Sequence, residues 1–324
     1  MRARLANLLT IPLVVAASLT AILSLAMQGG RISSVLDLVA QFAPLTLCAG
    51  LGVIGGGLLS HRPWRARLVI LGLMSMVSSA TLVVPEFIRP PAPTAPTAAP
   101  RKIKIIQFNA LRLNDQLVPI VDWLQAQHPD IVTIQETRHD LRDAILAQTG
   151  WQVAGAAGDL MIFSARPMIG MNRPSIPGDK MNWVNATYPS ASGPYEVLTV
   201  HLTWPLGQAQ RREWLEMAAI VARLPRERLI ITGDFNATPW GFTMRSGERD
   251  LEPQRRDRAL ATFPARWAAD GPIRSPIPIL PIDHVYAGPG WATVKVERGP
   301  PLGSDHYPLV ITLAPVSPAP PAQP

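Results

Sequence analysis

The chain has 324 residues, of which 48% are hydrophobic, and a formal net charge of +7 at pH 7. A strong positive charge can indicate a nucleic-acid partner, because Lys and Arg neutralise backbone phosphates. Here residues 1–100 carry seven Arg against two acidic residues, and the rest carries 23 basic against 21 acidic residues. Most of the excess charge therefore precedes residue 101. The single cysteine, Cys48, excludes a disulfide framework or a multi-cysteine zinc site within one chain.

Three apolar stretches near the N-terminus are long enough, or nearly so, to cross a membrane as helices of about 20 residues. They cover Leu8–Met27, Leu36–Leu59 and Leu68–Phe87. A secretory signal peptide is the alternative interpretation of the first stretch, because it follows a basic N-terminus. Two further apolar stretches follow and no small-residue cleavage site stands out, so we expect three transmembrane helices.

The distribution of arginines predicts how these helices are oriented, because basic residues of short loops stay in the cytoplasm. Arg2 and Arg4 precede the first stretch, the segment His61–Arg67 joins the second to the third, and only Arg31 lies between the first two. The N-terminus and the second loop are then cytoplasmic, and everything after Phe87 is outside. We therefore expect a multi-pass protein of the cytoplasmic (inner) membrane, with its soluble part on the extracytoplasmic, periplasmic side.

Proline-rich segments divide the chain into parts. Residues 89–100 read R-P-P-A-P-T-A-P-T-A-A-P, a composition that favours extended polyproline II and acts as a semi-rigid spacer. We expect a three-span anchor over residues 1–88, this linker, a folded domain over residues 101–315 and a disordered tail over residues 316–324.

Strands and helices mix in the predicted folded domain. Apolar runs predict strands over Lys102–Phe108, Ile131–Gln135, Tyr195–Leu202, Leu229–Thr232 and Leu309–Leu313, and amphipathic patterns predict helices over Gln116–Gln127 and Gln208–Arg223. Because strands outnumber helices, the pattern favours an α/β sandwich over a helical bundle.

Polar residues stand at the edges of these apolar runs. Asn109, Glu136, His201, Asp234 and Asp283 each follow a run directly, and Asp305 and His306 precede the last strand. Strand ends can deliver such side chains onto one rim of a rigid sheet. The sequence therefore predicts one site at which these residues converge.

Six motifs carry a resemblance to a known family. In chain order they read Q-F-N, I-Q-E-T, V-H-L, G-D-F-N, I-D-H and G-S-D-H-Y-P-L. This series resembles the endonuclease/exonuclease/phosphatase superfamily over about two thirds of the chain, and the layout of three spans, a linker and this domain is similar to its membrane-anchored bacterial members. The resemblance implies a four-layered α/β sandwich, in which two packed β-sheets are flanked by helices. It also implies hydrolysis of a phosphoester or phosphoanhydride with a divalent metal, usually Mg²⁺, with Mn²⁺ as an alternative.

The resemblance also implies which residues hold the metal. Glu136 would be the principal ligand, with Asn109 and Asp305 nearby, and carboxylate and amide oxygens are the ligands that Mg²⁺ prefers. Asn109 could instead cap a turn, as asparagine commonly does after a strand. Abasic-site endonucleases carry a further carboxylate two residues after this asparagine, where this chain has Leu111. The metal could therefore rest on fewer protein oxygens here.

Catalytic roles follow from the same resemblance. Asp234 and Asn236 would orient and deprotonate the attacking water. His306 and Asp283 resemble a His-carboxylate pair, in which the imidazole transfers a proton or contacts phosphate. His201 resembles a second histidine that contacts phosphate or assists the leaving group, although a histidine that merely ends a strand is the alternative.

The sequence leaves the substrate open. Arg138 follows I-Q-E-T, where a cation would contact the phosphate, although an ordinary surface arginine is the alternative. A hydrolase at the outer face of the membrane could act on a lipid-linked phosphate or pyrophosphate, and the weak charge of the soluble part favours this over an anchored endonuclease or exonuclease. A catalytically inactive membrane scaffold is the third hypothesis.

Overall fold

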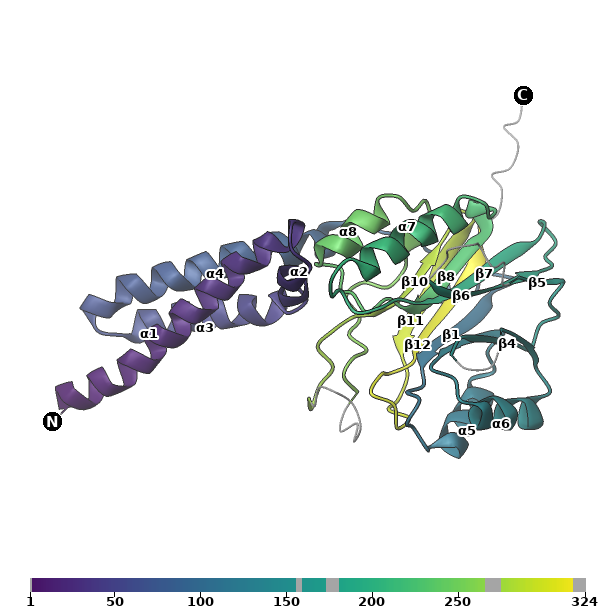
Figure 1. Ribbon diagram of the computed structural model, residues 1–324, viewed down its shortest axis with the longest axis horizontal. Coiled ribbons are helices and arrows are strands. Elements are labelled where there is room, and N and C mark those ends of the chain that lie inside the picture. The colour runs from purple at the N-terminus through teal and green to yellow at the C-terminus, as the bar shows by residue number, and fades with distance from the viewer. Residues whose placement is uncertain (1, 156–158, 173–180, 266–274, 317–324) are drawn as a thin grey trace, which may run out of the picture. The chain divides into compact units, whose positions relative to one another are not determined.

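The computed structural model describes residues 2–155, 159–172, 181–265 and 275–316 (Figure 1). The predicted tail, from residue 317 on, lies outside the described residues. Contacts divide the chain into two compact units. The first unit comprises Met1–Arg89, Pro205–Arg211 and Ala237–Ser246, and the second comprises Pro90–Trp204, Arg212–Asn236 and Gly247–Pro324.

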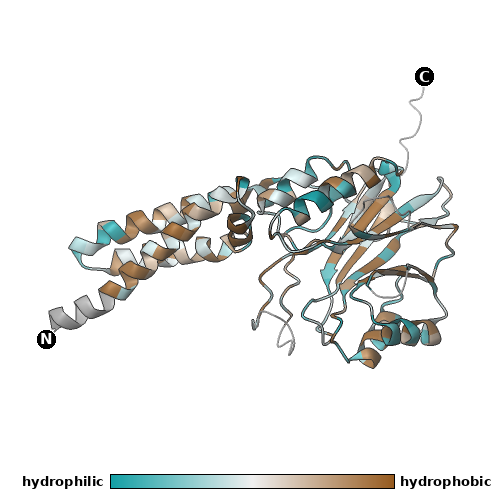
Figure 2. Cartoon of the chain, viewed as in Figure 1, coloured by the Kyte–Doolittle hydropathy of each residue, from teal (hydrophilic) through white to brown (hydrophobic). Residues whose placement is uncertain are grey.

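Apolar helices build most of the first unit. They are α1 (Arg2–Ala26), the 3₁₀ helix η1 (Met27–Arg31), α2 (Ser34–Ala40), α3 (Ala43–Leu59) and α4 (Arg62–Ile88). Two stretches are long and apolar enough to cross a membrane, Ile11–Arg31 and Arg62–Ile88, and there are three if α2 and α3 form one span. Hydrophobic residues run along these helices (Figure 2), and many large ones are exposed, including Leu19 and Val77. Lipid would cover such side chains at no cost.

The second predicted span is interrupted. Instead of one helix over Leu36–Leu59, the chain forms α2 and α3, which are bent by 59°. Pro44 lies in the first turn of α3, where its missing N–H costs nothing but where a helix continuing from α2 would lose a hydrogen bond. The second predicted span therefore consists of two helices that meet at residues 41–42, and it stays a possible single span.

Polar side chains also join the helices of the first unit. The Ser78 hydroxyl donates to the Ser24 carbonyl at 2.6 Å, and the Thr46 and Ser79 hydroxyls lie 2.8 Å apart. The Gln28 amide donates to the Ser78 carbonyl at 2.9 Å. Such hydrogen bonds hold helices together in an apolar environment, where hydrophobic burial does not favour contact with another helix over contact with lipid.

Two six-stranded sheets form the second unit. The first has the order β11-β12-β1-β2-β4-β3 and the second β5-β6-β7-β8-β10-β9. The strands of the first sheet are β1 (Ile103–Asn109), β2 (Ile131–Gln135), β3 (Gln152–Ala154), β4 (Met161–Ser164), β11 (Trp291–Arg298) and β12 (Leu309–Pro315). Those of the second are β5 (Gly170–Asn172), β6 (Asn182–Tyr188), β7 (Tyr195–His201), β8 (Leu229–Asp234), β9 (Gln254–Arg255) and β10 (Asp283–Ala287).

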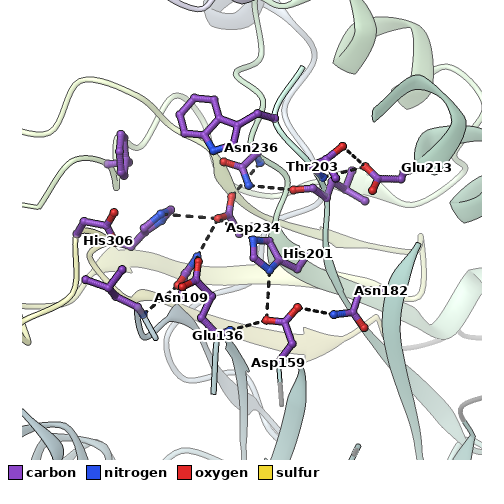
Figure 3. Close-up of a pocket in the computed structure, with 15 residues that line it drawn as sticks. Asn109, Glu136, Asp159, Asn182, His201, Thr203, Glu213, Asp234, Asn236 and His306 are labelled. Atoms are coloured by element: carbon purple, nitrogen blue, oxygen red, sulfur yellow. Dashed lines mark hydrogen bonds and ion pairs between the residues drawn. The ribbon is translucent and has the colours of Figure 1, made fainter. Parts of the chain in front are cut away.

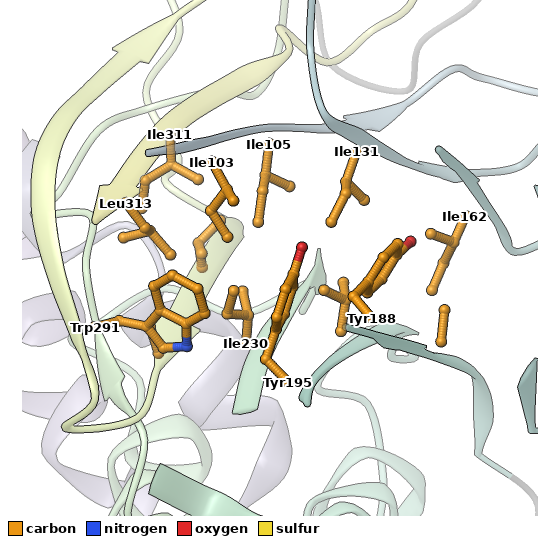
Figure 4. Packing of buried hydrophobic residues seen from close by; sticks show 14 of the residues in the cluster. Ile103, Ile105, Ile131, Ile162, Tyr188, Tyr195, Ile230, Trp291, Ile311 and Leu313 are labelled. Atoms are coloured by element: carbon orange, nitrogen blue, oxygen red, sulfur yellow. The ribbon is translucent and has the colours of Figure 1, made fainter. Parts of the chain in front are cut away.

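Helices flank the sheets on their outer faces. They are α5 (Leu117–Gln127), α6 (His139–Thr149) and α7 (Ala209–Val221), with the shorter η2 (Arg226–Arg228). Helix α8 (Phe242–Glu248) lies mostly in the first unit. Between the sheets lies an apolar core, in which Ile105 and Ile131 of the first sheet meet Tyr195 and Ile230 of the second (Figure 4). A second core packs α5 and α6 against the first sheet. The predicted four-layered α/β sandwich is confirmed.

Strand pairing places several predicted site residues directly opposite one another on neighbouring strands. Parallel β7 and β8 pair His201 with Asp234, and antiparallel β8 and β10 pair Asp234 with Asp283. Gly233 allows the close approach of β8 to β7, since a Cβ there would lie 2.1 Å from the Val200 carbonyl oxygen. In the other sheet, parallel β1 and β2 pair Asn109 with Gln135, so that Glu136 follows at the same edge.

Candidate active site

A cavity of about 580 Å³ opens at the ends of these strands. Seven of the predicted site residues line it: Asn109, Glu136, His201, Asp234, Asn236, Asp305 and His306. Asp283 lies behind His306 and contacts it. Figure 3 shows the polar side chains of both sheets pointing toward one another. The structure therefore brings these residues together, whereas their individual roles stay predictions.

Asn109 joins the two sheets at the base of the cavity. Its amide nitrogen donates to Glu136 Oε1 at 3.1 Å and to Asp234 Oδ2 at 3.0 Å. Its amide oxygen accepts the Leu111 N–H at 3.0 Å, which is the turn contact that the alternative interpretation of Asn109 requires. The side chain thus caps a turn and bridges two carboxylates at once.

Three residues at the cavity have a left-handed backbone, which is uncommon for residues other than glycine. Leu111, Glu136 and Asn236 have φ values of +58°, +54° and +47°. Each is held by a side chain: the Glu136 N–H donates to Asp159 and the Asn236 N–H donates to Asp234. Strained residues of this kind cluster at functional sites, where the surrounding structure enforces them.

His306 forms a buried ion pair with Asp283. Its Nδ1 lies 2.8 Å from Asp283 Oδ2, and its Nε2 lies 3.7 Å from Asp234 Oδ2. Although burial opposes the charged imidazole, the negative charges of Asp283 and Asp234 raise the pKa of His306 to about 10. Against the opposing effect of burial, the same pairing lowers the pKa of Asp283. In the absence of metal, His306 is therefore a cation that faces Asp234.

His201 has a carboxylate partner that the sequence did not reveal, Asp159. Asp159 Oδ1 lies 3.4 Å from His201 Nδ1 and accepts the Glu136 N–H at 2.9 Å. Burial opposes the charge of His201, but the hydrogen bond with Asp159 and the charge of Asp234 raise its pKa to about 9. Asp159 follows no apolar strand and belongs to none of the six motifs, so the sequence contained no signal for it.

Glu136 and Asp305 present two carboxylates to the same space. Burial raises the pKa of Asp305, and the negative charge of Glu136 raises it further, against the opposing charge of His306. Two acidic groups that repel each other in an open cavity have the chemistry of a hard-cation site.

Asp234, Asp283 and His306 also lie close enough to share an ion, with donor atoms within 4.8 Å of one another. Asp283 Oδ1 accepts the Gln107 amide at 3.0 Å and Asp283 Oδ2 pairs with His306, so hydrogen bonds already engage both oxygens.

Arg138 is placed differently from the other predicted residues. It is half-exposed at the start of α6, pairs with Asp140 and donates to the Asn114 carbonyl, and it is not among the residues that line the cavity. Glu213 of α7 and Thr203 are among the lining residues that lay outside the sequence predictions. Glu213 accepts both the backbone N–H and the hydroxyl of Thr203.

Solved structures with this fold include proteins of several kinds. The chain is similar to an endonuclease/exonuclease/phosphatase from Bacteroides vulgatus (16% identity, TM-score 0.55, covering 67% of this chain and 100% of that one). It is similar to D. rerio TDP2 complexed with single strand DNA product (15%, TM-score 0.54, 66% and 99%). A third is the Bacteroides thetaiotaomicron mannosyl-6-phosphatase Bt3783 (16%, TM-score 0.51, 65% and 99%).

No curated protein sequence matches the chain significantly. The profile of the Endonuclease/Exonuclease/phosphatase family, in contrast, matches residues 106–306, a span that begins in β1 and ends at His306. Because this match covers more than half of the chain and the fold agrees with it, the chain belongs to the endonuclease/exonuclease/phosphatase family.

Proposed function

We propose that this protein is a membrane-anchored, metal-dependent phosphoesterase that hydrolyses a phosphoester or phosphoanhydride. The observation that carries the proposal is the convergence of acidic, amide and imidazole side chains from both sheets on one open cavity. Phosphoryl transfer needs this combination: charge neutralisation on the phosphate, a positioned water and help for the leaving oxygen.

Glu136, Asp305 and Asn109 are the proposed metal-binding residues. The two carboxylates supply hard oxygen ligands, and the Asn109 amide adjoins Glu136. A bound Mg²⁺, or Mn²⁺ in its place, would neutralise charge on the substrate phosphate.

Asp234 is the proposed group that accepts a proton from the attacking water. It is buried and lies 3.7 Å from an imidazole nitrogen of His201 and 3.7 Å from one of His306. Asn236, whose amide donates to the Leu202 carbonyl at 2.9 Å, would orient that water. The two imidazolium groups would contact phosphate oxygens or donate a proton to the leaving group.

A lipid-linked phosphate or pyrophosphate is the proposed substrate class. The apolar N-terminal helices would hold the site beside the membrane, which raises the effective concentration of a membrane-bound substrate. Trp204 and Phe263 line the cavity next to His306, with Phe263 4.9 Å from its ring, and would give an organic group an apolar surface.

A nuclease is the second candidate, because TDP2 shares the fold and was solved with a single strand DNA product. The weak net charge of residues 101–324, which follows from 23 basic and 21 acidic residues, argues against extensive phosphate contacts. A catalytically inactive scaffold remains the third candidate.

The test uses the full chain in detergent micelles with three substrates: bis(p-nitrophenyl) phosphate, a single-stranded oligonucleotide and a polyprenyl pyrophosphate. We expect hydrolysis of the first and third with Mg²⁺ and none after EDTA treatment. Preferred cleavage of the oligonucleotide would establish the nuclease. A folded chain that hydrolyses none of the three would refute the phosphoesterase.

A further inference from the structure

One face of α2 carries three polar side chains at helical spacing. Ser34, Asp37 and Gln41 stand at positions i, i+3 and i+7, which lie on the same side of a helix. Asp37 is fully buried and Gln41 is 2% exposed, although both lie in the apolar N-terminal region. A buried carboxylate is costly unless hydrogen bonds compensate it, so their partners are informative.

Asp37 and Gln41 bind the segment Ala237–Ser246, which belongs to the same compact unit. Asp37 Oδ1 accepts the Phe242 N–H at 2.6 Å and Oδ2 accepts the Thr243 N–H at 2.9 Å. The Gln41 side-chain oxygen accepts the Thr238 N–H at 2.6 Å. Hydrogen bonds from backbone N–H groups to a carboxylate are stronger than those between neutral groups.

The contact is closely packed. The Trp240 indole N–H donates to the Gln41 carbonyl at 2.6 Å. A Cβ on Gly241 would lie 2.7 Å from the Gln41 amide nitrogen, and a Cβ on Gly30 would lie 2.5 Å from the Phe242 ring. A side chain at either position would therefore push against Gln41 or Phe242.

Ser34 binds the other loop of the first unit, Pro205–Arg211, by accepting the Gly207 N–H at 3.0 Å. The two loops have one feature in common: each continues directly from site residues. Pro205 follows the stretch from His201 to Trp204, and Ala237 follows Asn236 by one peptide bond.

We propose that Ser34, Asp37 and Gln41 are positioning residues of the active site, and that α2 fixes the two loops that leave His201 and Asn236. The N-terminal region is then a structural part of the catalytic machinery and not only a tether. This inference rests on the proposed hydrolysis. Misplacing a catalytic group by about 1 Å can cost about a hundredfold in rate, so the loss of this support should be visible in turnover.

The test compares isosteric variants in the full chain. Gln41→Met removes the acceptor for Thr238, and Asp37→Asn removes one of two acceptors. Gln28→Met is the matched control, because the Gln28 amide donates to Ser78 and Thr81 within the N-terminal helices. With bis(p-nitrophenyl) phosphate we expect kcat to fall about 10- to 100-fold in Gln41→Met, less in Asp37→Asn, with KM within about twofold and Gln28→Met near wild type.

Gly241→Ala tests the same contact without removing a hydrogen-bonding group, and we expect it to lower kcat as well. Amide hydrogen exchange of residues 238–243 gives a readout that needs no substrate: exchange should accelerate in Gln41→Met and Asp37→Asn and stay slow in Gln28→Met. Wild-type kcat in Gln41→Met, or an equal loss in Gln28→Met, would overturn the inference. If the wild-type chain hydrolyses none of the test substrates, the proposed function fails, whereas unchanged exchange in the variants refutes the contact itself.

Discussion

Two side chains at the cavity, those of Asn109 and Asp159, each hold more than one neighbour. Asn109 closes a turn and bridges Glu136 to Asp234, and Asp159 holds both the Glu136 backbone and His201. Substitutions here should therefore change chemistry more than stability when they preserve shape.

Glu136→Gln tests the metal site. It keeps the size of the side chain but removes the charge that a hard cation needs. Losing a residue that only supports a metal ligand costs about 10- to 100-fold in activity, and we expect Mg²⁺-dependent turnover to fall by more than that. The measurement is kcat against Mg²⁺ concentration, with circular dichroism to check the fold. Asp143→Asn, a change at an exposed carboxylate of α6, serves as the control. Full turnover in Glu136→Gln would remove Glu136 from the ligand set.

Asp159→Asn tests the His201 pair. Since Asp159 raises the pKa of His201, which is about 9, removing its charge lowers that pKa. The alkaline limb of the kcat profile, where His201 loses its proton, should then move to lower pH. Asn182→Ala is the control, because it removes a neutral donor to Asp159 and leaves the charge in place. An unmoved limb in Asp159→Asn would show that the protonation of His201 does not govern the rate.

Besides the groups at the cavity, the second sheet contains a buried network of charged side chains at the neighbouring strands β9 and β10. Asp257 Oδ2 lies 2.8 Å from His284 Nδ1 and 3.5 Å from Arg255, and its Oδ1 accepts the Val285 N–H. Burial opposes its charge, yet His284 and Arg255 lower the pKa of Asp257 to about 2. This network fixes the strand that carries Asp283.

Asp257→Asn tests that network. A carboxylate with a lowered pKa stabilises the fold above its unfolded value of 3.8 and loses that contribution as pH falls toward about 2. The contribution at neutral pH is about 2 kcal/mol. We expect a lower thermal midpoint in the variant at pH 7, and a difference from wild type that shrinks between pH 4 and pH 2. Asp122→Asn, at an exposed site on α5, should differ little from wild type throughout that range. A constant difference for Asp257→Asn would contradict the assignment.

As a whole, the chain combines apolar helices with an α/β sandwich, and where those helices cross a membrane the number of crossings decides on which side the sandwich lies. Three crossings after a cytoplasmic N-terminus place it outside, and two place it inside. Because α2 and α3 are bent relative to each other, they can form one crossing or none. α3 has 17 residues, which is at the lower end of the length that crosses a membrane.

Alkaline phosphatase fused after Pro100 tests the topology. We propose three crossings, because the arginines of residues 61–67 mark a cytoplasmic loop, so this fusion should be active and a fusion after Arg65 inactive. The reverse pattern, or activity in neither fusion, would place the catalytic unit in the cytoplasm.

Local pattern was enough for several strands and for seven of the residues that line the cavity. Apolar runs and the polar residues at their ends predicted β1, β2, β7 and β8, since strand periodicity and strand termini are properties of neighbouring residues. The six motifs likewise pointed to Asn109, Glu136 and Asp234 before any distance was known.

Contacts between distant residues required the folded chain. Asp159 contacts His201, which is 42 residues away in the sequence, and Asp37 contacts Phe242, which is 205 residues away. No local pattern encodes such a pairing. The break in the second predicted span has the same cause: hydropathy over residues 36–59 describes a continuous apolar stretch, whereas the bend coincides with Pro44 and with two buried polar side chains whose partners lie some two hundred residues away. Composition determined whether a segment favours an apolar or an aqueous environment. Tertiary packing decided which distant segments contact each other.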